Sequence, residues 1–444
     1  MSRNQPTISK GIDWSLVWIY FILSAIGIMA VFAVTYKDGD PIIQSFLGFK
    51  TDYSKQFYFF VVSFMVGLFI LLTDSKFFTA TANIWYATGI FLLLLVFAIG
   101  VEVDGTKSII RIGPIQFQPA EFCKISVALA LAKFLSRPET DFSQRKSQII
   151  AAAIALFPAA ISILQSETGL ALVYFAFFLV MYREGLPSGI ILMGFSVVVL
   201  FIAAILVPPN TLAIILTVIA VLMIYFLRRT IKRKRELLIK IIFIWLLCVG
   251  IQRFAVPFVF ANVLQRHQVE RIFDLFGIDN PYQKNDGTAV KTKKQKESGS
   301  QYNVRQSKIA IGSGRVTGKG LLKGTQTRYG FVPAQRTDFI FDTIGEGFGF
   351  IGSVVLLGIF LIMLFRIITI AERQRSAFSR CYAYGVGAVF FFHIFINVAM
   401  AVGLAPVIGI PLPFLSYGGT SLLTNAILLF ILIRLDADRQ MVLR

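Results

Sequence analysis

The sequence predicts an all-α polytopic membrane protein. Its 444 residues are 56% hydrophobic with a mean hydropathy of +0.73, and the apolar residues lie in continuous blocks of about 17 to 25 residues, the length of a membrane-spanning helix. The blocks lack the alternating pattern of membrane barrel strands, and only helices satisfy every backbone group within such a span. The first block, from about Leu16 to Val34, is too long for a removable signal peptide and is expected to be retained.

Each apolar block is assigned one span, which gives about twelve spans in a single membrane domain over residues 1–444. The expected spans are 15–35, 57–73, 80–100, 119–136, 148–165, 168–183, 187–207, 210–228, 237–257, 339–366, 382–402 and 418–434. Because an even number of spans returns the chain to the side of the membrane on which it began, both termini are expected on the same side. Short connections rich in Lys and Arg, at 133–147, 228–235 and 366–380, assign that side to the cytoplasm.

One large segment, 261–338, is then an extracytoplasmic loop. Its part 277–300 has almost no apolar residues and is expected to be a flexible, solvated excursion. No internal repeat is visible, which weakens the case for a transporter built from inverted repeats.

The composition excludes several classes of site. The formal charge is +19, but Lys and Arg fall between apolar blocks without interleaved aromatic residues, which argues against nucleic-acid binding. The three cysteines are scattered and describe no disulfide framework or thiolate metal site. The two histidines, His267 and His393, are far apart, which argues against a multi-histidine metal site or a Ser-His-Asp triad. Carboxylates and cations must therefore carry any chemistry.

The first polar segment is GTKSIIRIGPIQFQPAEFCK, residues 105–124. Glu121 and Lys124 are three residues apart and share one helical face. Ionised groups at membrane depth are costly, so they either pair with each other and lock helices together or line a substrate groove. Both interpretations remain open.

Two further outward-facing segments are rich in glycine or proline. Residues 302–341 combine six glycines with seven cations that can meet an anion, but they contain no P-loop, and an irregular loop with solvated charges is the alternative. Residues 403–423 read GLAPVIGIPLPFLSYGGTSLL, and their prolines prevent a regular helix. This segment is expected to be a re-entrant element closing a groove or a packed outer loop.

Three acids mark the stretch QRTDFIFDTIGEGFGF, residues 335–350. Asp338, Asp342 and Glu346 would share a face if a helix began by 338, where like charges repel. Thr337 or Asp338 is a candidate helix N-cap, which would explain Asp338 structurally. Capping does not explain Glu346, which must be paired, protonated or beside polar groups.

The chain resembles the SEDS family (shape, elongation, division and sporulation). The matching stretches are FQPAEFCK, QSETGLALV, YNVRQSKIAIGSG with GKG and GTQ, TDFIF followed by GE and GFIGS, and PLPFLSYGGTSLL. Motifs of this length and order cover most of the chain except its middle, and the glycine-rich set favours the elongation-type members of the family over the division type.

The resemblance implies a peptidoglycan glycosyltransferase that polymerises lipid II on the outer face of the cytoplasmic (inner) membrane and releases undecaprenyl pyrophosphate. The family's proposed catalytic aspartate falls on Asp338, which would accept a proton from the attacking sugar hydroxyl. Asp342 and Glu346 are assigned as modulators, because Asp342 can tune Asp338 or compete for its role. Substrate binding is assigned to Glu121, Lys124, Lys308, Arg315, Lys319, Arg336, Thr337 and Ser416.

The resemblance also implies a class B penicillin-binding protein transpeptidase as partner. No cofactor is identifiable; a divalent cation can assist the pyrophosphate, but no metal site can be assigned. A lipid II flippase and a scaffold that activates the transpeptidase are the alternative functions.

The chain departs from the family pattern in three places. Ile109 stands where a Trp is common, and in the FDTIGEGFGFIG stretch Asp342 is extra and Gly347 replaces a second glutamate. The family usually has ten spans, so the three apolar blocks within 187–257 predict a two-helix insertion, whose even number preserves the sidedness of the later spans.

Overall fold

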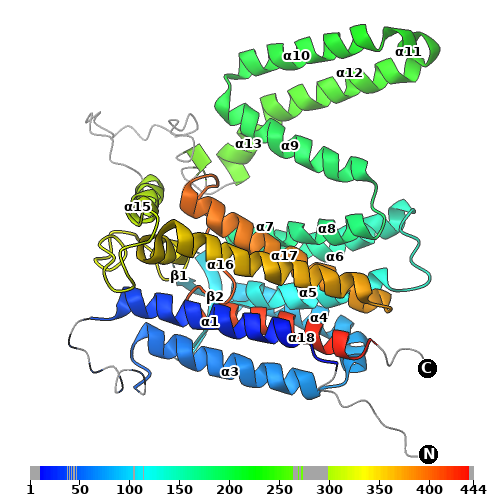
Figure 1. Ribbon diagram of the computed structural model, residues 1–444. Coiled ribbons are helices and arrows are strands. Elements are labelled where there is room, and N and C mark those ends of the chain that lie inside the picture. Colours follow the sequence, from blue (N-terminus) through cyan, green and yellow to red (C-terminus); the bar gives the residue numbers. More distant parts are fainter. Residues whose placement is uncertain are drawn as a thin grey trace, which may run out of the picture. The chain divides into compact units, whose positions relative to one another are not determined.

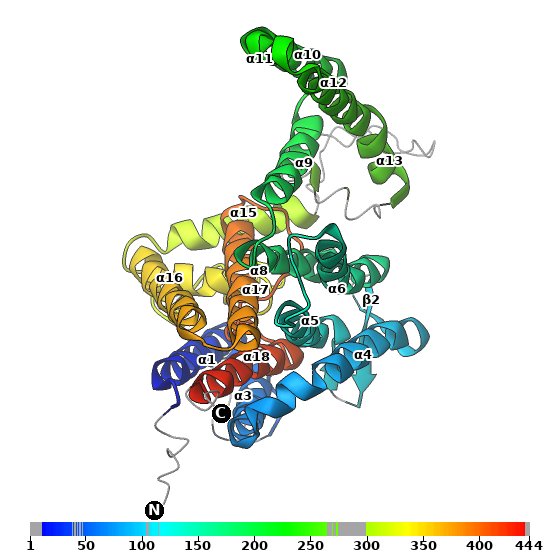
Figure 2. The ribbon, with the colours of Figure 1, turned by 90° about the vertical axis from the view of Figure 1, so that its right-hand side faces the viewer.

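The structure is a computed structural model that describes residues 11–439 except 38, 40, 42, 44, 45, 47, 104, 105, 114, 264–268, 270, 271 and 274–298. It is mostly helical (Figures 1 and 2). The chain forms two compact units, one of Met1–Leu186 with Asn303–Arg444 and one of Pro187–Tyr302. Residues 277–298 of the predicted flexible excursion lie outside the described residues.

The first unit is a bundle of helices with a small sheet. Its helices are α1 (Trp14–Thr35), α3 (Asp52–Leu72), α4 (Ser75–Ile99), α5 (Pro119–Leu135), α6 (Arg145–Leu164), α7 (Thr168–Val173), η2 (Tyr174–Ala176), α8 (Phe177–Arg183), α16 (Ile340–Arg373), α17 (Ala377–Val402) and α18 (Gly419–Ala437), and α15 (Gly299–Ser313) leads into it. Among membrane-length helices, α17 and α18 are the most deeply buried, with 67% and 78% of their most apolar stretch inside the protein. They form the core against which α3, α5 and α16 pack.

The prediction of a polytopic helical membrane protein is confirmed. Within the described part of the chain, ten helices are long and apolar enough to cross a membrane. The predicted spans 119–136 and 168–183 coincide with α5, which has 17 residues, and with the shorter apolar stretch Thr168–Arg183. The count of twelve spans therefore stays a prediction.

A three-stranded antiparallel sheet, which the sequence analysis did not predict, lies between α4 and α5. Its order is β1-β2-β3, formed by β1 (Val101–Val103), β2 (Thr106–Ile112) and β3 (Ile115–Phe117). Thr106 Oγ1 donates to Glu167 Oε1 at 3.2 Å, and the Ser108 hydroxyl donates to the same oxygen. Glu167, just before α7, thus anchors β2 to the bundle.

An ion-pair cluster joins the start of α1 to the ends of α16 and α18. Asp13 Oδ2 lies 2.7 Å from the Arg366 guanidinium and 2.9 Å from that of Arg373, which also pairs with Asp436. Burial raises the pKa of Asp13, but hydrogen bonds and charge from both arginines outweigh it and hold the pKa below its usual value. Both ends of the described chain therefore lie at one end of the bundle; their assignment to the cytoplasm stays a prediction.

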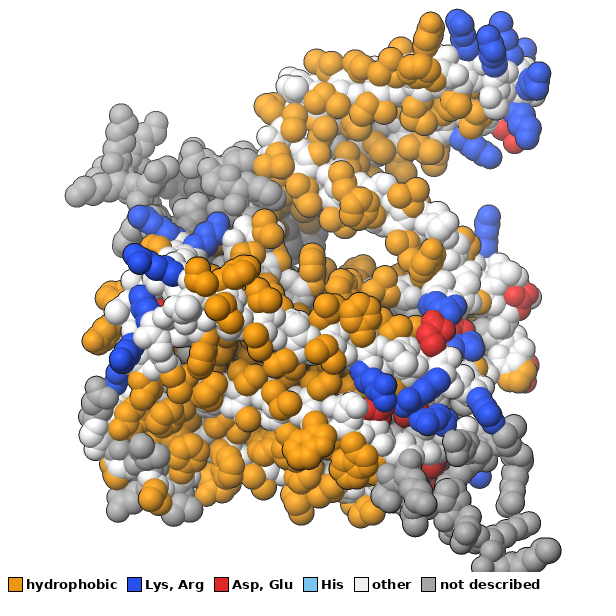
Figure 3. Space-filling model, viewed as in Figure 1, with side chains coloured by type: hydrophobic (Ala, Val, Ile, Leu, Met, Phe, Trp, Pro, Cys, Tyr) orange, Lys and Arg blue, Asp and Glu red, His pale blue; other side chains and the backbone are white. Residues whose placement is uncertain are grey.

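The side chains on the surface of the first unit are distributed as expected for a membrane protein. Figure 3 shows hydrophobic side chains covering the length of its helices, with Lys and Arg gathered near their ends. Apolar side walls with charged ends are the pattern expected of a bundle that crosses a bilayer.

The second unit holds three apolar helices within the range predicted to contain an insertion. Its elements are α9 (Ser188–Leu206), α10 (Pro209–Phe226), α11 (Arg228–Arg233), α12 (Arg235–Gly250), η3 (Ile251–Ala255), α13 (Val256–Phe258) and η4 (Val259–Val263). Helices α10 and α12 form a hairpin, in which Trp245 Nε1 donates to Thr217 Oγ1 at 3.2 Å. The three helices agree with the predicted blocks, and the assignment of two of them to an insertion stays a prediction.

Candidate functional site

An irregular segment, residues 403–418, connects α17 to α18, and its part from 410 to 416 is mostly buried among helices. Phe414 is 2% exposed, and its ring centroid lies 5.4 Å from that of Tyr20 and 5.5 Å from that of Phe390. Gly27 of α1 lies so close that a Cβ there would be 2.6 Å from the Phe414 carbonyl oxygen. Irregular backbone at membrane depth is tolerated where protein buries it, and of the two expectations for this segment the structure favours close packing.

Proline has no amide hydrogen, so this segment has fewer backbone donors than carbonyl groups. Buried polar side chains donate to several of these carbonyl groups instead. Asn397 Nδ2 on α17 donates to Ile410 O at 2.7 Å, and one turn earlier His393 Nδ1 lies 2.9 Å from Pro411 O. Gln56 on α3 binds both sides of the following turn: its Nε2 donates to Ser416 O at 3.2 Å and its Oε1 accepts from Gly418 N at 3.3 Å. None of these three side chains was assigned to the site from the sequence.

Residues 403–418, called the packed segment below, and Asn397 of α17 together hold the backbone around Asp338, the candidate base. Tyr417 N donates to Arg336 O at 2.8 Å, and Ser416 Oγ donates to Thr337 O at 2.6 Å. Asn397 Nδ2 donates to Asp338 O at 2.8 Å. Three successive carbonyl groups, from 336 to 338, are therefore bound by three separate donors.

Glu121 and Lys124 form a buried ion pair on α5. Lys124 Nζ lies 2.7 Å from Glu121 Oε2 and also 2.7 Å from His393 Nε2, and the three side chains are at most 1% exposed. An ammonium group is donor-only, so His393 Nε2 accepts and its Nδ1–H donates to Pro411 O. The structure thus contains the mutual ion pair that the sequence analysis left open, and extends it to the packed segment.

The helix that carries Asp342 and Glu346 begins at Ile340, so Asp338 lies before its start. Phe339 is its N-cap residue and no side chain caps the helix, so the expectation that Thr337 or Asp338 is the N-cap is wrong. The reason is a turn over 334–339, in which the amide groups of Thr337, Asp338 and Phe339 all bond to Ala334 O. Asp338 is partly exposed, and its Oδ2 would be 3.5 Å from a Cβ at Gly409.

Asp342 lies two residues into the helix and is fully buried. Its Oδ1 lies 2.8 Å from Ser307 Oγ, whose hydroxyl also lies 2.6 Å from Ala401 O. Asp342 therefore contacts α15 directly and is linked to the end of α17 through Ser307.

Glu346, one turn further, is also fully buried and organises the loop at 319–327. Its Oε1 lies 2.8 Å from Lys319 Nζ and from Thr325 N, and its Oε2 lies 2.9 Å from Thr327 N and 2.8 Å from Thr327 Oγ1. The Glu346 carboxylate is therefore surrounded by donors and paired with Lys319, one of the environments that the sequence analysis required for it.

Gly314 and Gly318 pack against the glycines of α16. A Cβ on Gly314 would lie 1.9 Å from Gly345 O, and one on Gly318 would lie 2.2 Å from Gly347 O. Gly320 N donates to Gly347 O at 2.8 Å. The close approach is backbone to backbone within the protein, so these amide groups are not available to cradle an anion.

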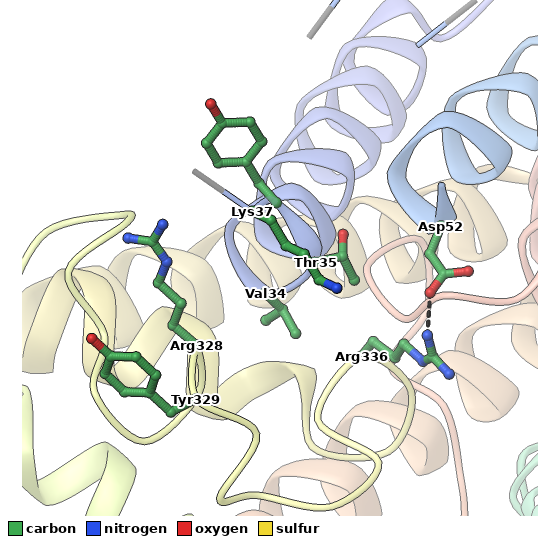
Figure 4. A pocket seen from close by; sticks show the side chains of 8 residues that line it. Val34, Thr35, Lys37, Asp52, Arg328, Tyr329 and Arg336 are labelled. Carbon is green, nitrogen blue, oxygen red and sulfur yellow. Dashed lines mark hydrogen bonds and ion pairs between the residues drawn. The ribbon is translucent and has the colours of Figure 1, made fainter. Parts of the chain in front are cut away.

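A pocket of about 500 Å³ opens beside the segment that precedes Asp338 (Figure 4). It is lined by Val34, Thr35, Tyr36, Lys37, Asp52, Arg328, Tyr329 and Arg336. Arg336 forms an ion pair with Asp52, the first residue of α3. Three cations against one acid give the pocket a positive balance, which favours an anionic occupant.

Tyr417 adjoins this pocket through Arg336. The Arg336 guanidinium lies 5.9 Å from the Tyr417 ring centroid. Burial, and then the nearby charge of Asp52, raise the pKa of Tyr417 to about 12, so the phenol is protonated at neutral pH. It can donate a hydrogen bond but does not act as a base.

The structure brings some of the predicted site residues together and separates others. Arg336, Thr337, Asp338 and Ser416 are neighbours, whereas Lys308 and Arg315 are exposed and Lys319 binds Glu346. His393 and Asn397 stand four residues apart in an apolar run, so they share a helix face, and intramembrane polar residues of this kind are a signal that sequence reasoning can use.

The sequence of the chain matches one family model over most of its length. The model FtsW/RodA/SpoVE, described as cell cycle protein, matches residues 14–236 and 183–441. The chain belongs to the FtsW/RodA/SpoVE family. This confirms the resemblance found in the motifs, because these are the division, elongation and sporulation proteins of the SEDS group.

Individual relatives match this FtsW/RodA/SpoVE-family protein over most of its length. The peptidoglycan glycosyltransferase RodA of Treponema pallidum (strain Nichols) is 29% identical over 438 residues, 96% of this chain and 97% of the relative. The peptidoglycan glycosyltransferase MrdB of Escherichia coli (strain K12) is 28% identical over 339 residues, 76% of this chain and 73% of the relative. A solved chain of a peptidoglycan synthase complex that coordinates polymerization and crosslinking has a TM-score of 0.64 at 22% identity, covering 96% of this chain and 98% of that chain, and supports the fold.

Proposed function

We propose that this family member is a peptidoglycan glycosyltransferase that polymerises lipid II into β-1,4-linked glycan strands. Two relatives carry the name peptidoglycan glycosyltransferase, which supports the reaction class. The 4-hydroxyl of the acceptor's GlcNAc attacks the anomeric carbon of the donor's MurNAc, inverts it and expels undecaprenyl pyrophosphate. One carboxylate suffices for a single displacement, unlike the pair of a glycosidase.

Asp338 is the general base in this proposal. The observation that carries the assignment is exposure: of the three acids in 335–350, Asp342 and Glu346 are 0% exposed and bound to the protein's own groups, whereas Asp338 is partly exposed. Only an accessible carboxylate can reach within hydrogen-bond distance of a substrate hydroxyl. The three bound carbonyl groups around it hold its backbone in one place, which favours catalysis by a positioned group.

The pyrophosphate of the donor is bound by the cationic pocket. Lys37, Arg328 and Arg336 line it, and Arg336 is two residues from Asp338. Positive charge stabilises the departing pyrophosphate as negative charge develops. Of the other residues predicted to bind substrate, Lys308, Arg315 and Thr337 are at least partly exposed. The side chains of Glu121, Lys124, Lys319 and Ser416 contact the protein's own groups, and their role in substrate binding stays a prediction from the sequence. Within the described residues, no group of three His, Cys, Asp or Glu can hold a metal ion, and the proposal assigns no metal site.

The setting of the proposed reaction is the outer face of the cytoplasmic membrane during cell elongation. Both termini are cytoplasmic in this proposal, and the partner is a class B penicillin-binding protein transpeptidase. The similarity to a chain from a complex that coordinates polymerization and crosslinking supports such a partner. The elongation role rests on the glycine-rich motif and on the RodA relative.

A lipid II flippase or a scaffold for the transpeptidase would use the same fold without a general base. The test is to incubate the purified protein and its partner with labelled lipid II and to measure glycan chains. We expect polymer from the wild type and essentially none from Asp338→Asn. Asp342→Asn is the control, because it makes the same substitution at a buried acid and is expected to stay active. No polymer from folded wild type with its partner would favour the rivals, and an active Asp338→Asn would remove the base assignment.

A further inference from the structure

The side-chain amide of Asn397 links the candidate base to the packed segment on the other side of α17. Both of its hydrogens are used: Nδ2 donates to Asp338 O at 2.8 Å and to Ile410 O at 2.7 Å. Asn397 is 0% exposed, and its Oδ1 has no hydrogen-bond partner within the described part of the chain. A buried asparagine that leaves its acceptor unused contributes through its two donors.

The other end of this link is held in place from α5. His393, one turn before Asn397 on α17, binds Pro411 O at 2.9 Å, and Lys124 binds His393 at 2.7 Å. The neighbouring carbonyl groups of Ile410 and Pro411 are therefore both attached to α17. Because Pro413 supplies no amide hydrogen, it cannot form the turn bond to Ile410 O that the residue three positions on would otherwise donate.

We propose that Asn397 is a positioning residue for Asp338, and that it transmits the position of the 410–417 segment to the base. This inference rests on the proposed function, since it assumes that Asp338 accepts the substrate proton. Asn397 does not touch the reacting atoms in this proposal. It acts on the backbone carbonyl of Asp338, directly beside the Cα from which the carboxylate projects, and so it sets the direction of that side chain.

Loss of the Asn397 side chain should reduce kcat and leave KM for lipid II almost unchanged. A misplacement of a reacting group by about 1 Å costs on the order of 100-fold in rate. Asn397→Ala should therefore reduce kcat by about 10- to 100-fold while KM for lipid II stays within about threefold. Asn397→Asp keeps the shape of the side chain, but an acid donates one hydrogen and can hold only one of the two carbonyl groups, so its kcat should lie between wild type and Asn397→Ala.

The matched control is Asn425 on α18. It is also 0% exposed with an unpaired Oδ1, but its Nδ2 contacts Ser421 Oγ of its own helix at 3.3 Å. Asn425→Ala removes the same atoms from the same kind of environment without touching residues 336–338. It should lower the melting temperature no more than Asn397→Ala, which also leaves two carbonyl groups without their donor, and it should leave kcat close to wild type.

The experiment measures kcat, KM and melting temperature for wild type, both Asn397 variants, Asn425→Ala and Asp338→Asn, with the full-length protein and its partner. A kcat loss in Asn397→Ala that Asn425→Ala matches, or a loss confined to KM, would overturn the positioning role. If Asn397→Ala does not purify as a folded protein, wild-type kcat in Asn397→Asp overturns it. An inactive wild type or an active Asp338→Asn would instead overturn the proposed function, so the two failures are distinguishable.

Discussion

The hydroxyl group of Ser307 lies 2.8 Å from the Asp342 carboxyl oxygen Oδ1 and, at the same time, 2.6 Å from the carbonyl oxygen of Ala401. A hydroxyl group carries one hydrogen, so it cannot donate to both oxygens. Both contacts are hydrogen bonds if Asp342 carries its own hydrogen and donates it to Ser307. Asp342, the acid that the family pattern lacks, then belongs to a buried chain of hydrogen bonds that joins α15, α16 and α17.

This relationship predicts that Asp342→Asn is tolerated. An asparagine amide donates to Ser307 Oγ as the carboxylic acid does, so the chain of hydrogen bonds to Ala401 O is preserved. Polymerisation of labelled lipid II should stay within about threefold of wild type. A folded but inactive Asp342→Asn would show that this acid competes with Asp338 for the role of base.

Glu346→Gln should destabilise the protein strongly. The substitution leaves the Lys319 ammonium without its carboxylate and replaces an acceptor of several amide hydrogens, at a cost of roughly 3 kcal/mol or more. Glu372→Gln is the control, because its pair with Arg183 is about half exposed and should contribute little to stability. Denaturation midpoints in detergent compare the two, and equal midpoints would contradict the structural role of Glu346.

Two neighbouring glycines should respond oppositely to alanine. A Cβ at Gly314 would lie 1.9 Å from Gly345 O, which forces the backbones apart and should cost about 2 kcal/mol or more. Gly312 lies in α15 with nothing within 4 Å of its Cβ position, so Gly312→Ala should be neutral or should stabilise by up to about 1 kcal/mol. Thermal unfolding of the two variants measures the difference, and similar shifts would contradict the close backbone contact.

The Asp13 ion pairs should make stability fall at acid pH. The pKa of Asp13 is lowered in the folded protein, so its contribution is present above the unfolded value of 3.8 and is lost as the pH falls through the folded pKa. Asp13→Asn retains a side chain that can cap α1 but cannot pair with Arg366 or Arg373. The melting temperature of wild type should exceed that of Asp13→Asn at neutral pH, and the gap should close below pH 3.8. A gap that persists unchanged into acid would assign the effect to packing.

Much of the candidate site could be predicted from the sequence because its motifs are contiguous. TDFIF placed Asp338 beside Arg336 and Thr337, and PLPFLSYGGTSLL identified the segment that holds them. Chain connectivity keeps such neighbours together in any fold. The contacts of Asp338 with Asn397, 59 residues away, and of Gln56 with Ser416, 360 residues away, depend on how helices pack and could not be predicted without homologous sequences.

The sequence by itself determined the membrane class, the family and the short list of acids, since apolar blocks and long motifs are properties of consecutive residues. Only the tertiary structure decided what each acid contacts. Burial gave Asp342 and Glu346 each a partner from another element, while the turn before α16 left Asp338 partly exposed. The physical reason is that spacing along the chain fixes which face of a helix a residue occupies, but packing fixes what that face meets.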